Sequence, residues 1–349
     1  MSRRVSGGAR TTGLRLAAVA VLLFVALIVA PRIDRYTLEI STTVLIYLAA
    51  VQGWNILAGY AGEVSLGTSA FVGAGSYTAA ILSTTLGFPP VALVAVSMLV
   101  GMILALVLSV PLLRVRGDYF TVATLAAALA VQAIVINVPA LGGGSGVNLD
   151  IAALPTGATL LYYAAAVAAF AAAASVLVRG SGFGLRLMAL RDDADAAQGV
   201  GIAVFRHRLG ALVLSSALIS AGGAVLALQQ TSASPQTALA FSWTINVLLM
   251  GVVGGLGTLL GPLVGVVVVY YGLTQQLNAF PTAGLVIEGI VLIAVVLLAP
   301  RGLWPTLASV SRRAWRRGGG PRLRTANLPA KQGSLADSVH AASPATDGG

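Results

Sequence analysis

Long apolar runs, almost free of charge, recur along the chain between residues 16 and 303. An α-helix rises about 1.5 Å per residue, so about 20 apolar residues cross the hydrocarbon core of a bilayer. Runs of this length therefore predict transmembrane helices. They lie at residues 16–30, 38–58, 63–86, 90–111, 118–139, 157–178, 209–229, 241–274 and 282–299. The pattern predicts an all-α, polytopic membrane helical bundle.

The first run, Leu16–Ala30, follows a basic segment, residues 1–15, which holds four arginines and no acid. A basic segment before a short apolar run is also the pattern of a secretory signal peptide. No clear small-residue cleavage site follows, and the rest of the chain is itself apolar enough to be embedded in a membrane. We therefore favour an uncleaved first transmembrane helix.

The run 241–274 is too long for one crossing, and it contains a glycine-rich stretch, Gly254–Thr258, that could form a tight turn. Two short crossings, near 241–254 and 259–275, give about ten membrane segments in all. A re-entrant hairpin over 241–275 would leave the later helices in the same orientation. The sequence leaves both alternatives open.

Basic residues predict which side each loop faces. With a cytoplasmic N-terminus, every lysine and arginine falls on the cytoplasmic side except Arg32 and Arg35, which have Asp34 and Glu39 beside them. Cytoplasmic loops of membrane proteins carry an excess of Lys and Arg. We therefore predict that both termini are cytoplasmic, as is the long loop 179–208.

Residues 304–349 lack apolar periodicity and are rich in Gly, Pro, Ser, Ala and Arg, so we expect a disordered cytoplasmic tail after the membrane domain, residues 16–303. The basic cluster Arg312–Arg317 lies shortly after the last apolar run, where it would hold the tail against anionic lipid. The net charge of +10 is therefore explained by topology and by the lipid bilayer, and we expect no nucleic-acid partner.

Composition supports the membrane class and narrows the chemistry. The chain is 57% hydrophobic and 9% charged, whereas a soluble domain carries about a quarter charged residues. Because there is no cysteine, disulfides and thiolate metal sites are excluded. His207 and His340 are too few for a histidine-rich metal cluster. We expect no metal, no cofactor and no catalytic activity, since no intramembrane protease motif is apparent.

Small residues recur four apart in several apolar runs. Helices in lipid associate by close backbone approach through such residues, so most of them predict packing seams. The seam residues are Ser69, Gly73, Gly251, Gly255, Gly257, Gly261 and Gly265.

Glycine-interrupted segments can also unwind and present backbone groups to a polar pathway. Gly59–Gly67 is the strongest candidate for such a break. The predicted translocation path contains Gly62, Glu63, Ser65, Gly67 and Thr68 from this region, together with Glu288.

The chain has few charged residues within its apolar runs, and this number helps to distinguish the possible energy sources for transport. Ion-coupled carriers usually need buried ionisable residues to bind the driving ion, and Glu288 is the one acid well inside an apolar run. This scarcity of buried charge weakens the interpretation as an ion-coupled secondary transporter, which stays as an alternative because sodium sites can also be built from carbonyls and hydroxyls. A pure scaffold would show no substrate-dependent phenotype.

The loop 179–208 contains a stretch, Leu187–Gln198, that predicts a short amphipathic helix ending at Gly199. Leu187, Leu190 and Ala194 would share its apolar side. Such a helix could lie at the membrane interface or dock into a groove of a partner protein. Periodicity does not distinguish these two interpretations.

Four blocks in this order resemble the permease subunits of branched-chain amino acid ABC importers, most closely the second of their two permease types. The blocks are GYAGEVSLGTSAFVGAGSY at 59–77, LRVRGDYFTVATL at 113–125, the loop Gly184–Ile202, and GGLGTLLGP at 254–262 with the closing Pro300–Leu303. Glu63, Thr68 and Ser76 depart from the family pattern, where glutamine, histidine and alanine are common. If these positions touch substrate, the specificity differs from that for leucine, isoleucine and valine.

The resemblance implies a bacterial inner-membrane importer subunit that works with a second permease, two cytoplasmic ATPase subunits and an extracytoplasmic solute-binding protein. It also implies that loop 179–208 docks on the ATPase, since Asp195–Ala197 and Gly199 resemble a degenerate form of the family's E-A-A-x-x-x-G loop. The chain has no phosphate-binding G-x-x-x-x-G-K-[ST] motif of its own. The predicted ATPase-coupling residues are Arg191, Asp192, Asp193, Asp195, Ala196, Ala197 and Gly199.

Overall fold

The computed structural model describes residues 34–115, 117–149, 155 and 157–277, together with scattered positions between 286 and 304. The predicted segments 1–15 and 16–30 lie outside the described residues, as do Glu288 and, apart from Trp304, the tail 304–349.

Within the described residues, six helices are long and apolar enough to cross a membrane. They are Arg35–Tyr60, Pro90–Leu112, Asp118–Asn137, Ala158–Gly180, Val204–Gln230 and Pro235–Gly254. The chain is thus an all-α polytopic membrane protein, as the sequence predicts. The count of about ten segments and the cytoplasmic placement of both termini stay predictions.

The elements follow one another with short connections. The helices are α2 (Arg35–Asn55), α3 (Thr68–Leu86), α4 (Pro90–Leu112), α5 (Asp118–Asn137), α6 (Ala158–Gly180), α7 (Gly182–Asp192), α8 (Ala194–Gly199), α9 (Val204–Gln230), α10 (Pro235–Ala238), α11 (Phe241–Gly254), α12 (Gly261–Val269) and α13 (Gln275–Leu277). Two π-helical turns, η2 (Ile56–Tyr60) and η6 (Tyr270–Thr274), extend α2 and α12. Two 3₁₀ turns, η3 (Pro139–Leu141) and η4 (Gly143–Ser145), precede the strand β1 (Val147–Asn148), which pairs antiparallel with β2 (Ser232–Ala233).

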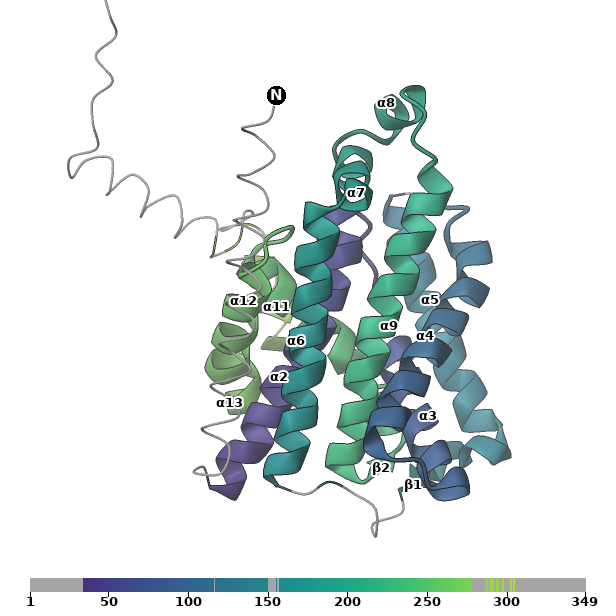
Figure 1. Ribbon diagram of the computed structural model, residues 1–349, viewed down its shortest axis with the longest axis vertical. Coiled ribbons are helices and arrows are strands. Elements are labelled where there is room, and N and C mark those ends of the chain that lie inside the picture. The colour runs from purple at the N-terminus through teal and green to yellow at the C-terminus, as the bar shows by residue number, and fades with distance from the viewer. Residues whose placement is uncertain are drawn as a thin grey trace, which may run out of the picture. The chain divides into compact units, whose positions relative to one another are not determined.

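Helices α2 and α9 form the centre of the bundle (Figure 1), and both are buried along most of their length. Helix α9 packs against α2, α3 and α4, while α6 packs against α2. Small residues allow these close contacts: a Cβ added at Gly223 of α9 would collide with the backbone of Val72 in α3. By contrast, few of the side chains of α4 and α5 are fully buried, as expected for helices that face lipid.

Local sequence signals account for the helix ends. Asp34 caps α2 by accepting a hydrogen bond from the backbone N–H of Thr37 at 3.2 Å. Pro90 stands in the first turn of α4, where its missing N–H costs nothing. Gly87 ends α3 in the left-handed conformation, at φ 59°, which suits a residue without a Cβ.

The stretch 241–274 folds as two antiparallel helices joined at Gly255–Leu260. Helix α11 packs on α12, where Gly265 would place an added Cβ against the carbonyl oxygen of Met250. The helix–turn–helix form is common to both alternatives that the sequence leaves open, so two crossings and a re-entrant hairpin both remain compatible with it.

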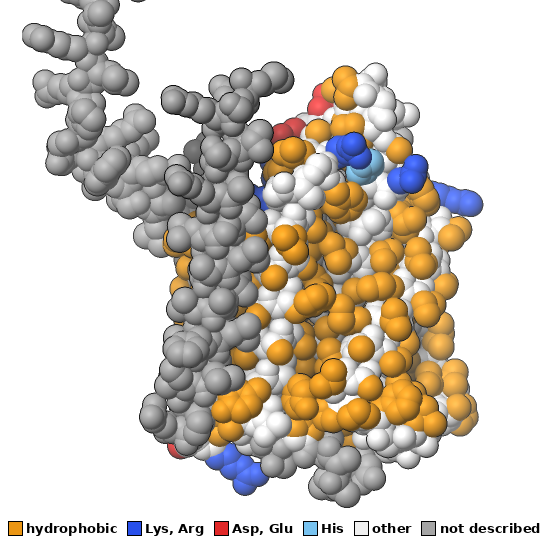
Figure 2. Space-filling model, in the orientation of Figure 1, with side chains coloured by type: hydrophobic (Ala, Val, Ile, Leu, Met, Phe, Trp, Pro, Cys, Tyr) orange, Lys and Arg blue, Asp and Glu red, His pale blue; other side chains and the backbone are white. Residues whose placement is uncertain are grey.

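Charge on the visible face is separated from the apolar surface. In Figure 2, hydrophobic side chains cover the middle of the bundle, while basic and acidic side chains gather mainly at the end that carries α7 and α8. The exposed hydrophobic residues on α4 include Leu99, Ile103 and Val107. This banded surface is the one expected of a protein that spans a bilayer.

Candidate functional site

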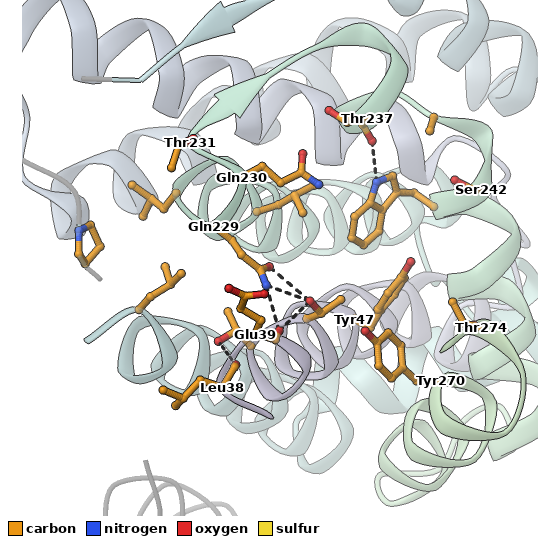
Figure 3. A pocket seen from close by; sticks show the side chains of 18 of the residues that line it. Leu38, Glu39, Tyr47, Gln229, Gln230, Thr231, Thr237, Ser242, Tyr270 and Thr274 are labelled. Atoms are coloured by element: carbon orange, nitrogen blue, oxygen red, sulfur yellow. Dashed lines mark hydrogen bonds between the residues drawn. The ribbon is translucent and has the colours of Figure 1, made fainter. Parts of the chain in front are cut away.

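A cavity of about 640 Å³ lies where α2 begins and α9 ends, at the opposite end of the bundle from α7 and α8. Residues from α2, α9, α10, α11 and η6 line it, so it is formed by parts of the chain that are distant in sequence (Figure 3). Its volume is in the range of small-molecule sites, about 300–1,000 Å³. The neutral polar residues of its lining are Thr42, Thr43, Gln229, Gln230, Thr231, Gln236, Thr237, Ser242 and Thr274.

A small hydrogen-bonded group orders one wall of this cavity. The Gln229 amide nitrogen donates to the carbonyl oxygen of Glu39 and to the Thr43 hydroxyl, both at 3.0 Å. Arg35 and Glu39 supply the charge in the lining, and both side chains are largely exposed. The deeper lining is therefore neutral and offers hydrogen-bond donors and acceptors to a small polar solute.

Three aromatic side chains pack together at the inner end of the cavity. The ring of Tyr47 lies 4.6 Å from that of Trp243 and 5.9 Å from that of Tyr270, centroid to centroid. The indole N–H of Trp243 donates to the Thr237 carbonyl oxygen at 2.9 Å, which fixes the orientation of its ring. All three side chains are buried, and they pack together in the part of the lining that lies furthest from the start of α2. We name Tyr47, Trp243 and Tyr270 the aromatic floor.

Sequence reasoning missed the cavity residues. The polar run Gln229–Ser232 at the end of an apolar helix was a visible signal, and so was the pair Thr42–Thr43 inside one. Neither group points to a site by itself, because polar residues are common at helix ends and occur inside apolar helices as well. Only the approach of α9 to α2 brings the two groups together.

The predicted path residues Gly62, Glu63, Ser65, Gly67 and Thr68 lie elsewhere, in and after the break between η2 and α3. None of them lines the cavity. The break runs from Ala61 to Gly67, and Gly62 adopts φ 76° within it. Glu63 and Thr68, which differ from the usual family pattern, therefore do not line this cavity. Their role in the translocation path stays a prediction.

Side chains of neighbouring helices bond the backbone of this break. The indole N–H of Trp54 donates to the Ser65 carbonyl oxygen at 2.9 Å. The Thr121 hydroxyl donates to the Val64 carbonyl oxygen, also at 2.9 Å. The Leu66 N–H donates to the Thr124 hydroxyl at 2.9 Å. An unwound segment between two membrane helices needs such partners wherever water does not reach its backbone.

Glu63 forms the principal ion pair of the break. Its Oε1 atom lies 2.7 Å from Nη2 of Arg208, and the exposed fractions of the two side chains are 6% and 11%. A buried charge is tolerated only when it is paired and hydrogen-bonded. Arg208 stands near the start of α9, so this pair joins the break to the helix that follows α8.

The predicted seam residues lie at several close approaches. An added Cβ at Gly73 would collide with the Leu239 side chain, and one at Gly251 would lie 2.8 Å from the ring of Trp54. Gly261 faces the carbonyl oxygens of Gly254 and Gly255. Gly255 and Gly257 adopt positive φ in the turn between α11 and α12. The Ser69 N–H donates to the Thr244 hydroxyl at 3.1 Å.

The single amphipathic helix expected over Leu187–Gln198 is wrong in its bounds. Two helices, α7 and α8, replace it, because Asp193 is extended and caps α8 with hydrogen bonds from the N–H groups of Asp195 and Ala196 at 3.0 and 2.9 Å. An aspartate that accepts these bonds starts a new helix and cannot continue the old one. Helix α8 ends at Gly199, as the sequence predicts.

Of the predicted coupling residues, Ala197 is buried and the others are exposed; Leu187 and Leu190, predicted for the apolar side of this loop, are buried with Ala197. The apolar side of this loop therefore faces its own bundle. The Arg191 guanidinium donates to the Gly59 carbonyl oxygen at 2.9 Å and pairs with Asp192. Exposed residues at the tip are Asp192, Asp193, Asp195, Ala196, Gly199 and Val200.

Comparison with known proteins identifies the family. The chain matches the family model described as the branched-chain amino acid transport system permease component over residues 36–296. It is 24% identical over 318 residues to the high-affinity branched-chain amino acid transport system permease protein LivM of Salmonella typhimurium strain LT2, covering 81% of this chain and 73% of that protein. LivM of Escherichia coli K12 is 23% identical over 307 residues, covering 78% of this chain and 71% of the relative.

No solved structure matches the chain. The family match includes the residues of the cavity, the break and the loop, since all of these lie between residues 36 and 277 except Arg35. The chain belongs to the branched-chain amino acid transport system permease family.

Proposed function

We propose that this chain is the membrane-spanning permease subunit of an ATP-binding-cassette importer for branched-chain amino acids or related small polar solutes. The observation that carries the proposal is the cavity of about 640 Å³, which has a neutral polar lining and the aromatic floor at its inner end. In this proposal the floor closes the site toward the other end of the bundle, which suits a transporter that alternates between two states.

The charge distribution supports an orientation for this path. The basic residues Arg179, Arg186, Arg191, Arg206 and Arg208 lie in or beside the α7–α8 loop. On the positive-inside rule that end faces the cytoplasm, and the cavity then faces the extracytoplasmic side. A solute-binding protein would deliver solute to the cavity, and the exposed tip of α8 would meet the ATPase.

The proposal requires a second permease and two ATPase subunits. The decisive experiment is purification of the tagged chain from its native membrane in mild detergent, followed by reconstitution of the purified assembly into proteoliposomes. We expect the ATPase chains and the second permease to co-purify, and we expect uptake of a labelled branched-chain amino acid to require ATP. A chain that purifies alone, with uptake driven by an ion gradient, would instead establish the secondary-transporter alternative.

A cavity variant links uptake to the proposed site. Ser242 is half-buried and lines the cavity, so Ser242→Trp should fill much of the solute space. We expect this variant to assemble with its partners and to lose most uptake, whereas Ser242→Ala keeps it. Full uptake by the tryptophan variant would exclude this cavity from the solute path.

A further inference from the structure

Two arginines hold the break between α2 and α3 from the side of the α7–α8 loop. Arg191 lies in the last turn of α7, and its Nη1 atom donates to the Gly59 carbonyl oxygen at 2.9 Å. Arg208 stands in α9 and pairs with Glu63 at 2.7 Å. Gly59 and Glu63 are four residues apart in the sequence, one at the end of η2 and the other just after it. We name Arg191 and Arg208 the arginine clamp and Gly59–Glu63 the clamped segment.

The contact of Arg191 with this segment includes its aliphatic chain as well as its charge. A Cβ added at Gly62 would lie 2.6 Å from Cγ of Arg191, so the arginine stem covers that glycine directly. The same guanidinium lies against the turn between α11 and α12, since an added Cβ at Gly257 would be 3.0 Å from Nη1. Arg179 donates to the Gly257 carbonyl oxygen at 3.0 Å and fixes that turn further.

Helix α8 lies between the two arginines in the chain and has few anchors of its own. Ala197, 4% exposed, is its buried residue. A displacement of α8 must therefore reach the bundle mainly through the last turn of α7, which contains Arg191, and through the start of α9, which contains Arg208. Hydrogen bonds from a guanidinium to a carboxylate or a carbonyl are strong and directional, so they transmit such a displacement well.

We propose that the arginine clamp positions the clamped segment, so that movement of α8 opens or closes the break between α2 and α3. This inference rests on the proposed function, in which a partner ATPase moves α8. Arg191 and Arg208 act here as positioning residues: they touch the backbone and the carboxylate of the break and not the solute cavity. The clamp would couple the loop to the inner part of the path, below the aromatic floor.

The test uses the complete transporter in proteoliposomes and measures solute imported per ATP hydrolysed. For Arg208→Gln we expect this ratio to fall about tenfold, within the usual range of coupling free energies. The double variant Glu63→Arg/Arg208→Glu restores the opposite charges and should recover part of the ratio. An unchanged ratio in Arg208→Gln overturns the proposal, as does a double variant no better than the single one. If the unmodified transporter shows no ATP-driven uptake, the proposed function has failed before the clamp is tested.

A second measurement does not depend on transport rate. The chain has no cysteine, so a cysteine introduced at Val64, a partly exposed residue of the break, is its single thiol. We expect its labelling rate with a maleimide to change when the ATPase is trapped with ATP and vanadate, and we expect Arg208→Gln to abolish that change. A change that persists in the variant shows that the break moves without the clamp and overturns the inference. Arg191→Lys, which keeps the charge but not the forked geometry, should give an intermediate response.

Discussion

Tyr47, Trp243 and Tyr270 come from three different elements and meet at the inner end of the cavity. Aromatic side chains contribute large buried areas with few rotatable bonds, so a packed group of three makes an effective barrier. Loss of one ring leaves a hole that neighbouring groups fill only in part. At the scale of single residues, we expect this group to act as the barrier of the proposed solute path.

We expect Trp243→Ala to make the closed state leak. Removal of the indole takes away both the ring packed on Tyr47 and the hydrogen bond to Thr237. Passive efflux of labelled leucine from proteoliposomes without ATP should rise several-fold over the unmodified protein. Trp243→Phe, which keeps a ring, serves as the control and should leak less. Equal and low efflux in both variants would show that the floor is not the barrier.

Gly265 tests the close packing of α11 and α12. Gly265→Ala forces a methyl group against the Met250 carbonyl oxygen, and overpacking of this kind costs about 1–3 kcal/mol. We expect the midpoint of thermal unfolding in detergent, followed by tryptophan fluorescence, to fall by several degrees. Gly272→Ala is the matched control, since an added Cβ there meets nothing within 4 Å. Equal midpoints for the two variants would contradict the packing assignment.

At the scale of elements, the loop between α6 and α9 combines a rigid base with an exposed tip. Helix α7 is held by buried Leu187 and Leu190 and by the stacking of Phe183 on His207, 5.7 Å between ring centroids. Helix α8 exposes acidic and small residues, and Val200 beyond it is 80% exposed. Ala197 faces the bundle, so an arginine there would disturb internal packing as well as any docking surface. Gly199 is the better position at which to test docking.

We expect Gly199→Asp to prevent association with the ATPase subunits. The position is exposed, lacks a positive φ and has nothing within 4 Å of an added Cβ, so the chain itself accommodates the side chain. The effect would come from a charge placed in the partner's groove. Co-purification of the ATPase measures it, and Gly144→Asp, an equally open position at the opposite end of the bundle, is the control. Normal co-purification with Gly199→Asp would exclude this surface from docking.

Asp193→Ala should loosen α8 without unfolding the bundle. The substitution removes the two capping hydrogen bonds to Asp195 and Ala196, and loss of an N-cap costs about 1 kcal/mol. Amide hydrogen exchange over residues 194–199 should become faster, while exchange in α9 is unchanged. Asp193→Ser retains a capping oxygen and should exchange like the unmodified protein. Unchanged exchange in Asp193→Ala would mean that other contacts hold the helix.

At the scale of the whole molecule, the two ends of the bundle differ, because the cavity is at one end and the charged α7–α8 loop is at the other. The cavity lies at one end, and the buried ion pair and the arginine clamp lie toward the other. The surface between them is apolar on the face shown in Figure 2. Because the two ends differ, labelling one position at each end determines the orientation of the chain in the membrane.

Single cysteines report that orientation, because the natural chain has none. We expect Val200→Cys to react with a membrane-impermeant maleimide only after the inner membrane is opened. Gly144→Cys, within η4 and shortly before β1, should react in spheroplasts with that membrane intact. The opposite pattern would invert the orientation inferred from the basic residues and place the cavity on the cytoplasmic side.

Local properties of the sequence were sufficient for the class of fold. The length of each apolar run decides whether it can cross a bilayer, and the family motifs are contiguous blocks. The helix ends near Gly199 and within Gly59–Gly67 were visible for the same reason, since glycine acts on its own stretch of backbone. The division of Leu187–Gln198 was not foreseen, because Asp193 fits the pattern of one helix as well as the cap of the next.

The sequence by itself thus determined a multi-pass helical permease, and it indicated the break and the exposed loop. Only the tertiary structure decided that Glu63 faces Arg208, that Arg191 holds Gly59, and that polar residues of α2, α9 and η6 share one cavity. These contacts join segments that are far apart along the chain, and helix periodicity shows which side of a helix is small or polar but not which helix lies against it. Helix contacts are harder to predict for a membrane protein than for a soluble one. Positions that face lipid are apolar, as buried positions are, so residue type does not separate the two.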